Sequence, residues 1–150
     1  MSDATQAAVT HFSSGYNCSQ SVLMALCAPY GLDTDTAARL ATGFGVGMYR
    51  GATCGAVSGA MLAIGLFGGG GGADGAAAKA ATYDRIEDFY SRFRKLHGSL
   101  VCRELIGLDP STPEGLERAR REGRFKTLCL SFVRDATAIA AAIIEESGQA

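Results

Sequence analysis

Apolar residues recur along this chain at the three- and four-residue spacing of amphipathic helices, and no run alternates β-branched with polar residues as a strand would. Caps, glycines and prolines divide the pattern into segments. The predicted helices cover residues 3–13, 17–28, 34–41, 54–67, 76–97, 102–106, 113–122 and 127–146. The pattern therefore predicts an all-α fold, a compact bundle of about seven or eight short and medium helices.

The longest predicted helix, 76–97, has the clearest amphipathic pattern, and Gly98 closes it. Charged residues occupy its opposite face. Its apolar stripe consists of Tyr83, Ile86, Phe89, Tyr90, Phe93 and Leu96. We expect this stripe to face the core.

Two glycine-rich segments interrupt the helices. Residues 43–52 (GFGVGMYRGA) lead into the helix that carries Cys54, and residues 68–75 (GGGGGADG) form a flexible link. At 150 residues the chain is long enough for one domain with a sizeable core, so we assign residues 1–150 to a single domain.

Composition and charge narrow the class of protein. Hydrophobic residues make up 47% and charged residues 19%, and the net charge of −1 gives no electrostatic footprint for nucleic acid. The first residues show no signal-peptide pattern, and the longest apolar segment, 52–67, is too short for comfortable membrane insertion. We expect a soluble cytoplasmic protein, and in that reducing compartment its five cysteines indicate catalysis, redox exchange or metal binding rather than structural disulfides.

Four cysteines stand where helices are predicted to begin: Cys18, Cys54, Cys102 and Cys129. Each follows a capping residue or turn signal, namely Asn17, Thr53, Ser99 and Thr127. A helix N-terminus carries roughly half a positive charge and unpaired N–H groups, which favour the thiolate over the thiol. We therefore expect four helix starts to converge on one sulfur-based centre.

Cys27 departs from this pattern, because it lies near the end of its helix on the apolar face and reads as a small hydrophobic residue. The segment GATCGAVSGA, 51–60, spaces Gly55 and Gly59 four residues apart, which makes one helix face small. Either a second helix or a bulky cofactor could use that space. Arg50 and Arg103 are the cations nearest in sequence to Cys54 and Cys102, and either could stabilise a thiolate or a bound cluster.

These motifs resemble a redox-active family, C_GCAxxG_C_C, whose pattern is a cysteine, then Cys-Gly-Ala-x-x-Gly, then two further cysteines. The matching elements are Cys18 in YNCSQSVL, the complete run CGAVSG at 54–59, Cys102 in CRELIG, and Cys129 in the last helix. The resemblance covers nearly the whole chain. It implies a small helical protein with four redox-relevant cysteines.

The four cysteines are separated by 36, 48 and 27 positions, which excludes a local CxxC loop and the short-spaced zinc or ferredoxin motifs. Any shared site must be assembled by the tertiary fold. We expect the four thiolates to hold a [2Fe–2S] or [4Fe–4S] cluster for electron transfer with a redox partner protein. The alternatives are a cofactor-free thiol/disulfide oxidoreductase or redox sensor, and a structural zinc or adaptor protein. The small-residue faces also suggest self-association into a homo-oligomer.

Overall fold

The predicted all-α fold is confirmed. The structure is a computed structural model that describes residues 1–73 and 75–148; Asp74, in the glycine-rich link, and the last two residues lie outside it. Its α-helices are α1 (Asp3–Ser13), α2 (Cys18–Leu26), α3 (Thr34–Ala41), α4 (Gly55–Gly68), α5 (Gly75–His97), α6 (Cys102–Ile106), α7 (Pro113–Arg121) and α8 (Arg124–Gly148). Three short turns, η1 (Ala28–Tyr30), η2 (Thr42–Phe44) and η3 (Gly47–Gly51), lie between helices. In the described part of the chain the β-structure is limited to one isolated bridge, Thr53 to Val101.

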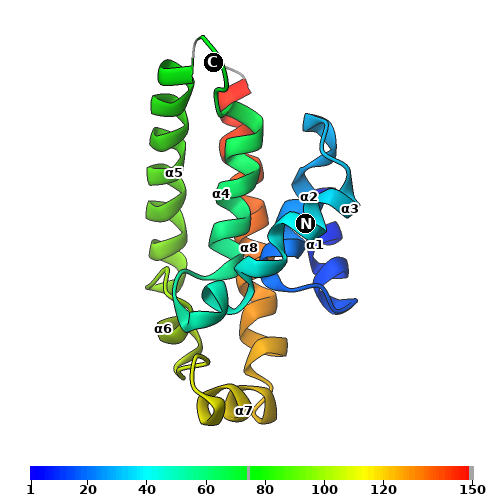
Figure 1. Cartoon of the computed structure of the whole chain (residues 1–150), viewed down its shortest axis with the longest axis vertical. Helices are drawn as coiled ribbons and strands as arrows, with labels where there is room; N and C mark the ends of the chain where they lie inside the picture. Colours follow the sequence, from blue (N-terminus) through cyan, green and yellow to red (C-terminus); the bar gives the residue numbers. More distant parts are fainter. Residues whose placement is uncertain (74, 149–150) are drawn as a thin grey trace.

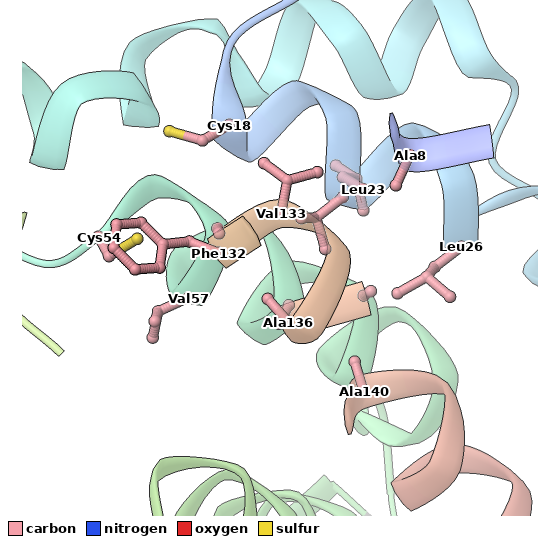
Figure 2. Close-up of a cluster of buried hydrophobic side chains, with 14 of the residues drawn as sticks. Ala8, Cys18, Leu23, Leu26, Cys54, Val57, Phe132, Val133, Ala136 and Ala140 are labelled. Atoms are coloured by element: carbon pink, nitrogen blue, oxygen red, sulfur yellow. The ribbon is translucent and has the colours of Figure 1, made fainter. Parts of the chain in front are cut away.

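The helices are arranged around α8. Helices α4 and α8 run side by side, with α5 on one flank, α1 to α3 on the other, and α6 and α7 at one end (Figure 1). Residues of α8 at helical spacing, including Phe132, Val133, Ala136 and Ala140, are buried against α2 and α4 (Figure 2). This buried face of α8 forms the centre of the core.

Among the described helices, α2 and α4 have the most extensive contact, and Gly59 allows them to approach closely. A Cβ at Gly59 would stand 2.7 Å from the Ser19 carbonyl oxygen and 3.1 Å from Val22. Both Ser19 and Val22 are fully buried. Gly59 therefore serves helix packing, the first of the two uses expected for the small-residue face.

Side-chain caps determine several helix starts. Asn17 and Gln20 form a reciprocal capping box at α2, with Asn17 accepting from the Gln20 N–H at 2.9 Å. Asp33 accepts from the Thr36 N–H at 2.8 Å at the start of α3. These starts agree with the sequence pattern because the capping signal is local.

The predicted start of the last helix at Thr127 is wrong, since α8 begins at Arg124. Gly123 adopts a left-handed conformation, with φ +69°, and separates α7 from α8 there. The Thr127 hydroxyl donates to the Gly123 carbonyl at 3.0 Å, as a residue within a helix does, instead of capping the helix. Cys129 consequently lies in the second turn of α8.

The stripe predicted for α5 is too wide. Phe89 and Phe93 are fully buried, but Tyr83 and Leu96 are 59% and 63% exposed. Helix α5 lies at the edge of the bundle. Among the described helices, only α4 and α8 have extensive contacts with it. A narrow strip of its surface is therefore enough to cover that contact.

Helix α8 is also long and strongly apolar. Among the helices that the structure describes, it is the one long and apolar enough to cross a membrane, with a mean hydropathy of 1.6 over its most apolar 18-residue window. Of that window, 44% is buried inside the fold. A core helix of a soluble protein has the same composition.

Candidate functional site

The four cysteines predicted to converge line one cavity of about 140 Å³. Their exposed fractions are between 5% and 9%. Cys27 does not line this cavity and is fully buried at the end of α2. Figure 2 shows Cys18 and Cys54 toward one end of the buried cluster, with the Phe132 ring beside Cys54. The cavity compares with an engineered cavity of ~150 Å³ that accepts benzene.

Three of the four cysteines stand at helix starts as predicted. Cys18 is the first residue of α2, Cys54 is the N-cap of α4, and Cys102 is the first residue of α6. Cys129, in the second turn of α8, is the exception, because that helix begins earlier than predicted.

The bridge between Thr53 and Val101 joins two of the cysteine-bearing segments. The Cys54 N–H donates to the Leu100 carbonyl at 2.8 Å, and the Cys102 N–H donates to the Ala52 carbonyl at 2.6 Å. Successive side chains of an extended segment point to opposite faces. The side chains of Cys54 and Cys102 therefore both point to the face opposite the one that carries Thr53 and Val101. Diagonal neighbours in such a pair lie roughly 7–8 Å apart. The backbone therefore brings these two cysteines to the same wall of the cavity.

Backbone N–H groups surround two of the sulfurs. Those of Val46, Ser19 and Gly55 are directed at the Cys18 sulfur, and those of Ala56 and Val57 at the Cys54 sulfur. Such donors stabilise negative charge on sulfur, whether on a free thiolate or on a thiolate bound to metal.

Gly55 provides the space for the Cys18 sulfur. A Cβ at this position would overlap Cys18 Sγ and would stand 3.0 Å from the Phe44 carbonyl oxygen. Glycine in the CGAVSG motif is therefore required by close approach of a side chain from α2. Gly55 also lines the cavity, as expected for a site residue.

The expectation that helix starts lower the thiol pKa values is wrong for this site. Burial has the largest effect on the pKa of each of the four thiols. It raises the pKa values of Cys18, Cys54 and Cys129, and it raises the pKa of Cys102 to about 12. The neighbouring cysteines raise the pKa values of Cys54, Cys102 and Cys129 further, because several thiolates in one apolar cavity repel. The partial charge of a helix end is outweighed by desolvation. Without a positive partner the four side chains are protonated thiols.

The two arginines proposed to support the site do not line the cavity. Arg50 is exposed and donates to the Tyr49 carbonyl at 3.3 Å. Arg103 is exposed and donates to the Gly51 carbonyl at 3.5 Å. Gly59 is likewise absent from the residues that line the cavity, since it faces α2.

The cysteines are neither paired nor grouped around a single ion. All five are free thiols. In residues 1–73 and 75–148, no three side chains of His, Cys, Asp or Glu lie in an arrangement that could hold one metal ion. The four cysteines line the cavity without forming such a group.

The apolar walls of the cavity were not identified from the sequence, although part of the signal was present. The walls are Phe12, Val46, Leu105, Ile106, Phe125 and Phe132. Phe125 lies four residues before Cys129, and Phe132 lies three residues after it. Leu105 and Ile106 follow Cys102 by three and four residues. At these spacings each pair shares a helix face with its cysteine. Phe12 and Val46 reach the cavity through the tertiary fold alone.

Comparison with known families agrees with these motifs. Residues 16–143 match the family described as "Putative redox-active protein (C_GCAxxG_C_C)". The match covers most of the chain and includes all four cysteines of the cavity, so the chain belongs to this family, and a redox role agrees with that description. Comparisons with curated proteins and with solved structures found no match.

Proposed function

We propose that Cys18, Cys54, Cys102 and Cys129 together hold an iron–sulfur cluster used for electron transfer. The observation that carries the proposal is the convergence of four cysteines, from four different helices or helix caps, on one apolar cavity. Four cysteine thiolates are the ligand set of both [2Fe–2S] and [4Fe–4S] clusters.

The distribution of the sulfurs favours a cluster over a single zinc ion. Zinc bound by four cysteines needs every sulfur at about 2.3 Å from one point. No such group occurs among the described residues. A cluster binds its cysteines through more than one iron atom, so it suits sulfurs spaced around a cavity.

The charge balance of the cavity supports a bound metal centre. Burial and mutual repulsion raise the pKa values of Cys54, Cys102 and Cys129, and among the described residues no arginine or lysine lines the cavity. A bound metal centre would supply the positive charge that the thiolates lack, because coordination deprotonates a thiol outright. The N–H groups directed at Cys18 and Cys54 would then stabilise the remaining negative charge.

When bound, an iron–sulfur cluster supplies one-electron transfer. The chain's own part is to position four thiolates, to exclude water by means of Phe12, Phe125 and Phe132, and to make room for sulfur at Gly55. We also propose a reducing cytoplasmic location, which five free cysteines support.

A cofactor-free thiol/disulfide oxidoreductase agrees less well with the site. Its attacking cysteine has to be an accessible thiolate with a lowered pKa. Here Cys18 and Cys54 are 9% and 5% exposed, and burial raises the pKa of each.

Iron and acid-labile sulfide analysis of anaerobically purified protein, together with its visible absorption, tests the proposal. We expect about two or four irons per chain with matching sulfide. Cys54→Ser and Cys102→Ser should each lose most of that iron. Cys27→Ala is the matched control and should retain it, because Cys27 is buried outside the cavity. Colourless protein from cells with cluster-assembly capacity, or iron retained in Cys54→Ser, would contradict the proposal.

A further inference from the structure

Residues 46–49, here called the strap, have an unusual backbone. Val46, Gly47, Met48 and Tyr49 have φ values of 55°, 60°, 57° and 57°, so four consecutive residues are left-handed. Side chains with a Cβ are disfavoured in this conformation, and a β-branched residue such as Val46 is a genuine outlier. Backbone strain of this kind persists where the surroundings enforce it, and it concentrates at functional sites.

The strap forms part of the cavity wall. Val46 lines the cavity, and its N–H is directed at the Cys18 sulfur. A Cβ at Gly47 would stand 2.8 Å from Cys102 Cβ, so the strap also lies against the start of α6. Met48 and Tyr49 are 52% and 61% exposed. The strap thus spans from one cysteine to another, with its outer side chains in solvent.

The three phenylalanines of the cavity wall are held differently. Phe12 belongs to α1, and Phe125 and Phe132 belong to α8, two helices that pack extensively against each other. Moving these residues would separate core helices. Moving the strap would let its residues leave the left-handed conformation. It would break local contacts, such as the hydrogen bond of 3.0 Å that the Ala52 N–H donates to the Gly47 carbonyl.

We propose that the strap is the gate of the four-cysteine cavity, which opens by leaving its left-handed conformation and admits reagents or cofactor components without unfolding of the bundle. The gate rests on the cavity and the backbone strain, and it holds whether the cysteines bind a cluster or react as thiols. Its failure is therefore distinguishable from failure of the cluster assignment.

Alkylation of the iron-free, reduced full chain by an uncharged maleimide, followed cysteine by cysteine by mass spectrometry, tests the gate. Met48→Gly and Tyr49→Gly relieve strain in the closed strap, and should slow labelling of the cavity cysteines by about two- to fivefold. Met48→Val adds a β-branched side chain at the same φ, and should accelerate labelling by about threefold or more. Since both native side chains are exposed, these changes act on the backbone and leave core packing intact.

Cys27 is the internal control, because it is fully buried outside the cavity and reports opening of the bundle. Its labelling rate should be the same in all four proteins. Opposite changes for Met48→Gly and Met48→Val at the cavity cysteines, with Cys27 constant, support the gate. Unchanged rates at the cavity cysteines, or parallel changes at Cys27, would overturn it.

Discussion

Replacing Gly55 by alanine tests the geometry of the cysteine site directly. The new Cβ would overlap Cys18 Sγ and would stand 3.0 Å from the Phe44 carbonyl oxygen and 3.3 Å from the Ser19 nitrogen. Two of these three neighbours are backbone atoms, which cannot rotate away. The Cys18 side chain must therefore move out of its position in the cavity.

The expected loss of stability is the balance of two effects. Overpacking a well-packed core costs about 1–3 kcal/mol, and replacing glycine by alanine in a helix returns about 0.5–1 kcal/mol. A net loss of about 1–2 kcal/mol lowers the Tm of a domain of this size by roughly 3–6 °C. Iron content should fall to less than half of the wild-type value, because Cys18 no longer points at the same place.

Gly65→Ala is the matched control in the same helix. A Cβ at Gly65 would meet nothing within 4 Å, so that variant gains the alanine preference without a clash. Its Tm should rise by about 2–3 °C and its iron content should stay at the wild-type level. Thermal unfolding by circular dichroism and iron analysis measure both quantities. Equal Tm values and equal iron in the two variants would refute the inference that Gly55 makes room for the Cys18 sulfur.

Three further changes test the electrostatics and the packing. The pKa of Cys102 is raised from 9.0 to about 12 in the fold, so the iron-free reduced protein should lose stability as the pH rises above about 9. The loss should be up to about 1.4 kcal/mol per pH unit for each such thiol. Urea unfolding at about pH 8 and at about pH 10 measures it, and Cys102→Ser should lose less stability between the two pH values than the wild type does. An identical loss in that variant would exclude the Cys102 thiol as its source. Phe89→Ala should lower the free energy of unfolding, measured in urea, by about 3–5 kcal/mol. Tyr83→Ala, at an exposed position of the same helix, should lower it by less than about 0.5 kcal/mol. Similar losses in the two variants would contradict the narrow buried strip of α5. Gly59→Ala places a Cβ 2.7 Å from the Ser19 carbonyl and should lower the Tm by roughly 2–6 °C, and an unchanged Tm would argue against close packing of α2 on α4.

The sequence by itself determined most of the helices and the identity of the four cysteines. Helix boundaries follow from signals that act within one turn, such as the capping box of Asn17 and Gln20, so they are readable without the fold. The start of α8 escaped this reading because Gly123, and not the threonine chosen as a cap, separates it from α7. The helical spacing of Phe125 and Phe132 from Cys129 also places them on the same helix face as that cysteine.

Only the tertiary structure decided the electrostatic character of the site. A helix start is a local feature and predicts a lowered thiol pKa, but desolvation depends on atoms that arrive from every side. At Cys102 this surrounding burial outweighs the helix start and raises the pKa to about 12. The same holds for the left-handed residues 46–49, whose strain is maintained by contacts with Cys18 and Cys102 from distant parts of the chain. Contacts between segments tens of residues apart depend on how whole helices pack, and one-dimensional periodicity does not specify that packing.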